Sequence, residues 1–170
     1  MMRLMVFASL LFVLSSCWPS SVSFKDTGSM PAEWKTFSVK TLEVLAPNAP
    51  LNYSPSLTEQ LKDGIQNNTR LLLNTTFGKG EVNIEGRVIS YNVSPIAIQG
   101  NNNASQNRLT VSVQFSIQVT QPKEDLITLT ATRFADFDAG TNLSSVEGGL
   151  LDDINKQIVQ DVINKLLSNW

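Results

Sequence analysis

The feature that most constrains the fold is a strict alternation of apolar and polar side chains in the second half of the chain. From residue 109 to residue 119, every odd position is apolar and every even position is Thr, Ser or Gln. Successive side chains of a β-strand point to opposite faces of the sheet, so this run predicts a long strand with one buried and one polar face. We expect these residues to form the core face: Leu109, Val111, Val113, Phe115 and Ile117.

Three further strands are predicted around this one. Apolar residues alternate with polar ones at 82–88 and again at 127–131, where the polar residues are threonines, and the pattern breaks at Phe134. A turn-rich segment at 121–125 separates two of these runs and indicates a hairpin, so the three strands can form an antiparallel meander. The fourth strand is expected at 35–44, where a change of parity between Val39 and Leu42 indicates a bulge or a change of face.

Two helices are predicted by apolar residues at helical spacing. The first is expected to begin at Ser54-Pro55, with Ser54 as its cap, and to continue through an apolar stripe. That stripe comprises Leu57, Leu61, Ile65 and Leu72. The second is expected to begin with a capping box from Ser144 to Glu147 and to run almost to Trp170. We expect Ile154 and Ile158 of this helix, with Leu61 and Ile65 of the first, to cover the core strand.

These elements predict an α+β fold in the order β-α-β-β-β-α. A helical connection follows the first strand, so this strand should pair in parallel with a neighbour. The expected architecture is a two-layer sandwich, in which two helices cover one face of a four-stranded mixed sheet.

The N-terminus resembles the signal of a bacterial lipoprotein. A short positive start is followed by an apolar run over residues 4–14 and then by Leu14-Ser15-Ser16-Cys17. The resemblance to a lipobox implies cleavage before Cys17, attachment of diacylglycerol to its thiol and acylation of the new amino group, for example with palmitate. The alternatives are an ordinary secretory signal with a chance cysteine, or a core cysteine.

The expected domains follow from this signal. Residues 1–16 would be a removed signal peptide, 17–33 a lipidated tether, and 34–170 a single α+β domain. No acidic residue follows Cys17 directly. By analogy with lipoprotein sorting, this favours retention in the outer membrane with the domain facing the periplasm.

The composition excludes several classes of function. The chain has no histidine and one cysteine, which removes Ser-His-Asp and Cys-His catalysis and the usual zinc sites. We therefore expect no enzyme activity and no cofactor. Asp136 and Asp138 could form a catalytic carboxylate pair on one strand face, although a polar strand end is the simpler explanation.

The charge content also limits the partners. A net charge of −2 argues against a nucleic-acid surface. Charged residues make up only 16% of the chain, against roughly 25% in a typical soluble domain. Such a low charge content is explained either by drift of the sequence or by a surface that another protein covers, where unpaired charges would be costly to desolvate.

The segment 99–107 is longer than a hairpin connection requires and is rich in asparagine. It is either a solvated loop or a tip that reaches into a partner. In the second case Asn101, Asn102 and Asn103 would contact that partner through neutral hydrogen-bonding groups.

Two stretches carry a resemblance to a known family. One runs from Tyr91 to Gly100 and continues through 107–111, and the other runs from Arg133 to Asp138 and continues through 143–147 to the closing Trp170. With the lipobox and the order of elements, they resemble the LptE family of lipopolysaccharide-assembly lipoproteins, in the branch that ends soon after the second helix.

The resemblance implies a partner, the outer-membrane β-barrel LptD. It implies a non-catalytic protein that plugs this barrel, faces both the periplasm and the barrel lumen, and helps to assemble a barrel that inserts lipopolysaccharide into the outer leaflet. Direct contact with lipopolysaccharide is also possible for such a protein. The residues leave two alternatives: an accessory lipid-binding lipoprotein of another envelope lipid-transport system, or a carboxylate-dependent secreted hydrolase.

Overall fold

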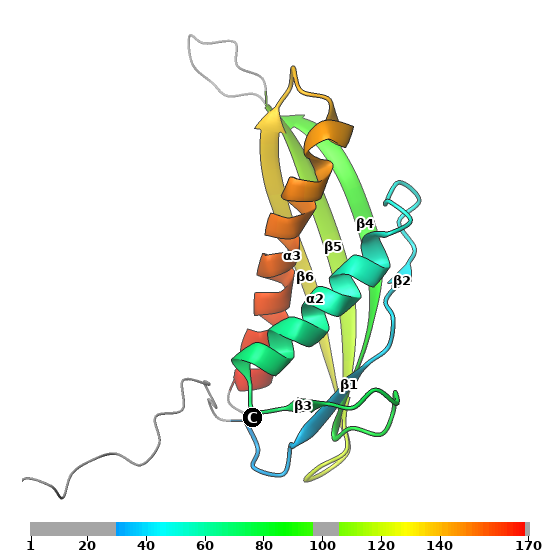
Figure 1. The fold of residues 1–170 in the computed structure, drawn as a ribbon, viewed down its shortest axis with the longest axis vertical. Coiled ribbons are helices and arrows are strands. Elements are labelled where there is room, and N and C mark those ends of the chain that lie inside the picture. Colours follow the sequence, from blue (N-terminus) through cyan, green and yellow to red (C-terminus); the bar gives the residue numbers. More distant parts are fainter. Residues whose placement is uncertain (1–29, 97–105, 169–170) are drawn as a thin grey trace, which may run out of the picture.

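Two helices lie across one face of a mixed β-sheet in the computed structural model, which describes residues 30–96 and 106–168 (Figure 1). The elements in chain order are β1 (Thr36–Val39), β2 (Glu43–Val44), α2 (Tyr53–Asn68), β3 (Leu72–Leu73), β4 (Val82–Ile96), β5 (Gln106–Val119), β6 (Asp125–Asp138) and α3 (Leu143–Leu167). The strand order is β3-β1-β4-β5-β6, and β2 also pairs with β4. The fold is therefore α+β with two helices on a mixed sheet, as predicted.

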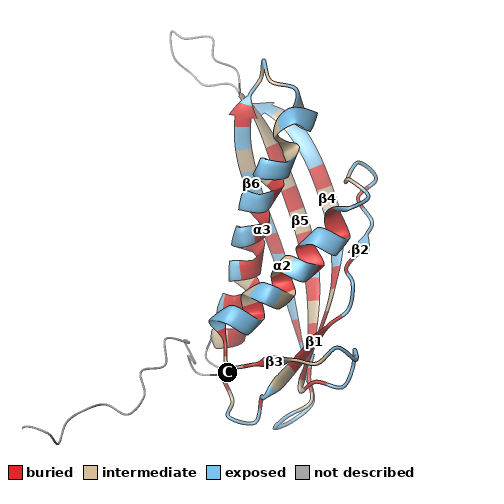
Figure 2. Ribbon diagram, viewed as in Figure 1, coloured by how far each residue is buried: buried red, intermediate tan, exposed pale blue. Residues whose placement is uncertain are grey.

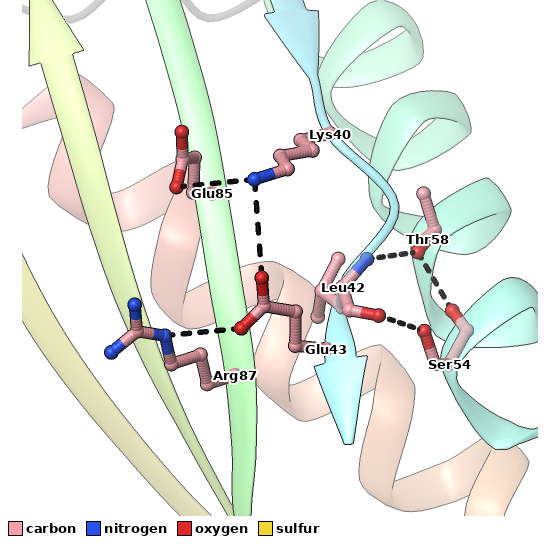
Figure 3. Close-up of polar contacts among 7 residues, drawn as sticks. All are labelled: Lys40, Leu42, Glu43, Ser54, Thr58, Glu85 and Arg87. Carbon is pink, nitrogen blue, oxygen red and sulfur yellow. Dashed lines mark hydrogen bonds and ion pairs between the residues drawn. The ribbon is translucent and has the colours of Figure 1, made fainter. Parts of the chain in front are cut away.

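The sheet has six strands in the described part of the chain, so the prediction of four was wrong. The strand expected at 35–44 is divided into β1 and β2, because helix α2 draws the link at Leu42 out of the ladder. Leu42 N donates a hydrogen bond to Thr58 Oγ1 (3.1 Å), and the Leu42 carbonyl accepts one from Ser54 Oγ. The Leu42 side chain is buried, which explains the change of parity in the sequence (Figure 3).

The additional strand β3 lies where the first helix was expected to continue. The helix ends at Asn68, and the Thr69 hydroxyl donates to the Ile65 carbonyl (2.7 Å). Leu72 therefore does not belong to the helical stripe; it is 62% exposed and pairs in parallel with Thr36 of β1. Strand β1 is also parallel to β4, which confirms the predicted parallel pairing.

Both helix starts differ from the sequence prediction. Helix α2 begins at Tyr53, and the side chain of its N-cap residue, Asn52, makes no cap bond. The expected cap, Ser54, lies inside the helix, where its hydroxyl donates to the Leu42 carbonyl. Helix α3 begins at Leu143, and its first turn is capped by the side chain of Asn142. Glu147 does not complete a capping box, because its carboxylate accepts a hydrogen bond from Tyr91.

Strands β4, β5 and β6 form the predicted antiparallel meander. They are longer than the alternation indicated, because β6 continues past Phe134 to Asp138. A register shift between Val88 and Ser90 places one extra residue, Ile89, in β4. Such a bulge increases the local twist of the strand.

The core lies between the helices and the sheet, where the buried residues gather in Figure 2. All nine residues that were predicted to form it are buried without measurable exposure: Leu61, Ile65, Leu109, Val111, Val113, Phe115, Ile117, Ile154 and Ile158. The prediction of the core face is thus confirmed. The even-numbered residues of β5 consequently point to the opposite face of the sheet.

Candidate functional site

The face of the sheet that lies away from the helices is lined by neutral polar side chains. At its centre, Ser112 of β5 lies between Ser90 of β4 and Thr132 of β6. The hydroxyl oxygens of Ser112 and Thr132 are 2.9 Å apart. We call this surface the open face, and its neutral polar members on β5 and β6 are Thr110, Ser112, Gln114, Ser116, Gln118, Thr128, Thr130 and Thr132. All eight are partly or fully exposed. The exposed apolar residues Leu126 and Phe134 of β6 lie on the same face.

The chemistry of the open face suits a polar partner. Hydroxyl and amide groups can donate and accept hydrogen bonds. Covering them costs much less desolvation energy than covering unpaired charges. In the described residues, no element of the chain lies over this face, since both helices pack on the other side (Figure 1). The surface can therefore receive a large polar partner.

Four charged residues stand at one part of the open face and cancel one another. Lys40 Nζ lies 3.9 Å from both Glu43 Oε1 and Glu85 Oε2. Arg87 Nε lies 3.4 Å from Glu43 Oε2, across the β2–β4 pairing (Figure 3). These side chains are about half exposed, so each pair contributes little to stability. Their sum is neutral, and the open face therefore has almost no net charge here.

A second ion pair occupies the end of the sheet next to the 96–106 connection. Arg108 binds Asp136 with two hydrogen bonds of 2.7 and 2.9 Å, and its guanidinium lies 3.7 Å above the centre of the Phe134 ring. The hydrogen bond from Arg108 lowers the pKa of Asp136. Asp138 accepts a hydrogen bond from Gly140 N (2.7 Å) at the turn into α3. The two carboxylates thus have separate structural partners, and Asp136 is held ionised, which does not suit a general acid.

Two buried tyrosines connect the sheet to both helices. Tyr53 donates to Asn155 Oδ1 (2.8 Å), Tyr91 donates to Glu147, and the rings meet edge-on at 6.4 Å. Burial raises the pKa of both phenols. They stay neutral at physiological pH and serve as hydrogen-bond donors inside the domain. The sequence analysis missed this network, although a polar Asn155 next to the apolar stripe of α3 was a visible signal.

A known protein family matches most of this sequence. The sequence model of LptE, described as lipopolysaccharide-assembly, matches residues 39–166. The chain belongs to the LptE family. LptE proteins are non-catalytic accessory lipoproteins of lipopolysaccharide assembly at the outer membrane. None of the curated proteins matches this chain.

Solved structures share the fold of this LptE-family chain. A hypothetical protein from Chlamydia trachomatis has a TM-score of 0.56 at 10% identity, with 80% of this chain and 99% of that chain covered. A protein from Xanthomonas campestris also has a TM-score of 0.56, at 9% identity, with 86% and 91% covered. At such low identities the similarity shows the fold alone.

The two sets of site residues predicted from the sequence lie outside the described part of the chain. They are the lipidation site Cys17 and the asparagines Asn101, Asn102 and Asn103. Within residues 30–96 and 106–168, no group of three or more acidic or metal-binding side chains could hold a metal ion. No helix in those ranges is long and apolar enough to cross a membrane.

Proposed function

We propose that this LptE-family protein is a lipid-anchored plug and assembly factor for an LptD-type β-barrel, which inserts lipopolysaccharide into the outer leaflet of the outer membrane. The observation that carries this proposal is the open face, a neutral polar surface that the described chain leaves uncovered. Family membership supports the process in which the protein acts.

The open face matches the inside of an outer-membrane barrel. The interior of such barrels is polar, so a plug must meet it with hydrogen-bonding groups rather than with apolar ones. Serine, threonine and glutamine satisfy this requirement without unpaired charges, and the ion pairs of Arg108 and Arg87 are already neutralised by their partners. We expect the interface to exceed the roughly 1,600 Å² of a standard complex.

The length of the strands also suits this role. Strands β4, β5 and β6 contain 15, 14 and 14 residues, and 14 residues extend about 46 Å at the usual rise of a β-strand. The apolar band of an outer-membrane barrel is about 25 Å tall. A plug that lies along the barrel axis would therefore fill the lumen and still extend beyond it toward the periplasm.

The N-terminal segment supplies the membrane anchor in this proposal. Residues 1–16 are the removed signal, Cys17 carries the lipid, and 17–33 connect it to the domain at 34–170. One acyl chain gives only marginal membrane binding, whereas three chains on one residue would hold the domain at the membrane permanently. The anchor thus keeps the plug next to the barrel during assembly.

The connection between β4 and β5 is the second contact that we propose. Asn101, Asn102 and Asn103 would meet the barrel wall at the end of the sheet marked by Arg108. Replacing 99–107 by a two-residue Asn-Gly turn should spare folding and weaken barrel association. Equal recovery of the barrel with and without the loop would refute this contact.

Co-purification from detergent tests the proposed function. The tagged, lipidated protein should recover one outer-membrane β-barrel in equal amount. A tagged anchor that carries only residues 1–33 controls for recovery through the membrane and should bring no barrel. If the full chain recovers no barrel either, the plug function is wrong, and an accessory lipid-binding lipoprotein becomes the better explanation.

A further inference from the structure

Strand β6 forms one edge of the sheet, and it is a long and regular edge. It pairs with β5 along its full length, from Asp125 to Asp138, without a register shift. In the described ranges no strand pairs with its other side. Fourteen consecutive residues therefore border the sheet with one side of their backbone unpaired by a strand.

The register shows which backbone groups are directed outward. Thr120 N donates a hydrogen bond to the Glu81 carbonyl (2.9 Å), and this pair continues the β4–β5 register by one position. The even-numbered residues of β5 therefore make their backbone hydrogen bonds with β4, and the odd-numbered residues make theirs with β6. Val113 faces Ala131 in the next pairing, so the odd-numbered residues of β6 bond back to β5. Residues of an antiparallel strand alternate between their two neighbours. Thr128, Thr130 and Thr132 consequently direct their N–H and C=O groups away from the sheet.

The middle of this edge, residues 126–132, carries no charged side chain and lacks the usual protection against strand addition; the aspartates lie near its two ends, at positions 125, 136 and 138. Natural proteins block exposed edges with prolines, bulges or lysines, but residues 125–138 contain none of these. The one basic residue, Arg133, is bound to Asp161 of α3 (Nε to Oδ2, 2.8 Å) and does not guard the edge. An unprotected edge of this length invites pairing, which indicates that it is covered when the protein works.

A shallow groove of about 560 Å³, with a mixed polar and apolar lining, accompanies the edge on the helix side. Its β6 wall is formed by residues 129–133, and its other wall is formed by Asp161 and Asn164 of α3 and by the C-cap residue Ser168. A strand added to β6 would place alternate side chains over this groove and the others beside the threonines of the open face. The hydroxyl groups on the open-face side, and Asp161 and Asn164 on the groove side, offer hydrogen-bonding partners to polar side chains of the incoming strand.

We propose that the edge of β6 binds an extended, polar segment of the barrel partner by β-augmentation. This inference rests on the proposed function and identifies the element through which the barrel is held. The threonines of this edge belong to the open face, so the open-face contact and the strand-pairing contact with the barrel form one continuous surface. A second copy of this chain fits less well as the partner. Each β6 carries three aspartates and one arginine, so the β6 strands of two copies would repel each other.

Proline substitution at an outward-facing position tests the inference in the full lipidated protein. Thr130→Pro removes one N–H from the free edge and no ladder bond to β5, which a strand edge tolerates. Thr130→Val keeps the N–H and is the matched control. We expect Thr130→Pro to lower barrel recovery at least tenfold below that of Thr130→Val, which loses only the hydroxyl, with both thermal melts close to wild type. Full barrel recovery with Thr130→Pro would overturn the inference.

Amide hydrogen exchange gives a second measurement that needs no variant. The amides of Thr128, Thr130 and Thr132 should exchange rapidly in the isolated protein and at least a hundredfold more slowly in the barrel complex. Rapid exchange in the complex would contradict strand addition. Failure of the wild-type protein to recover any barrel would instead overturn the proposed function and this inference together. A dimer of the isolated chain that Thr130→Pro dissociates, with barrel recovery unchanged, would assign the edge to a second copy.

Discussion

Gly64 of α2 packs directly against Val159 of α3, and a Cβ atom at position 64 would overlap Val159 Cγ1. The two helices can approach this closely only because residue 64 has no side chain. We predict that Gly64→Ala costs about 1–3 kcal/mol of unfolding free energy, as overpacking does in a tight interior. Urea denaturation of the two proteins measures this loss.

Two variants control this prediction. Gly148 of α3 has open space around its Cα, so Gly148→Ala should raise stability by about 0.5–1 kcal/mol through helix propensity alone. Adding Val159→Ala to Gly64→Ala should recover part of the loss, because it removes the overlapping methyl group. If Gly64→Ala gained as much stability as Gly148→Ala, the helices would not meet at this point.

The second prediction tests the register of β5. Val113 is fully buried, whereas Gln114 is exposed on the open face. Val113→Asp would bury a charge without a partner and should cost several kcal/mol, enough to unfold a domain of this size. Gln114→Asp should leave the melting temperature within a few degrees of wild type. An unchanged thermal melt for Val113→Asp would contradict the assigned core face.

The third prediction concerns pH. The Glu81 carboxylate accepts hydrogen bonds from the Thr36 hydroxyl (2.6 Å) and the Thr36 backbone N–H (2.7 Å), and the hydroxyl bond is the main reason for its lowered pKa. A lowered pKa in the folded state stabilises the protein above the unfolded pKa, and this contribution is lost as the pH falls through the folded pKa. Thr36→Val should therefore raise the pKa of Glu81 and weaken this acid dependence.

Carboxyl chemical shifts followed through an acid titration measure the Glu81 pKa directly. Asp136, whose lowered pKa depends on the hydrogen bond from Arg108 and not on Thr36, should keep the same pKa in both proteins. If Thr36→Val left the Glu81 titration unchanged, the Thr36 hydroxyl would not be the group that holds the carboxylate ionised.

Much of this fold could be predicted because its main signals are local. The alternation at 109–119 predicted both β5 and its buried side, and helical spacing predicted Ile154 and Ile158 as core residues. The strand β3 and the division of the predicted 35–44 strand into β1 and β2 were missed, because segments of two residues carry no periodicity. The expected helical position of Leu72 failed because Thr69 ends the helix three residues earlier.

The candidate site was less accessible from sequence. The threonines of β6 were visible as polar alternation, but their position at a sheet edge depends on the order of the strands in space. Asp136 and Asp138 were recognised as a pair, whereas the cross-strand partner of Asp136, Arg108, lies 28 residues away. Long-range pairing of this kind leaves no mark in local periodicity.

The fourth prediction tests the anchor. Cys17→Ala removes the only thiol of the chain and should leave an unprocessed or soluble precursor. Mass spectrometry of the mature wild-type protein should find the lipid mass on its N-terminal cysteine. An unmodified cysteine in the mature protein would refute lipidation. Ser16→Thr, a conservative change next to Cys17, is the control for the effect of a substitution in this segment.

Depletion of the protein in cells tests the central claim most directly. A plug that fills the barrel and holds it in an export-competent state is needed for both assembly and transport. We predict that the amount of correctly folded barrel and the amount of lipopolysaccharide at the cell surface fall together. Normal barrel assembly with intact surface lipopolysaccharide after depletion would contradict the plug function.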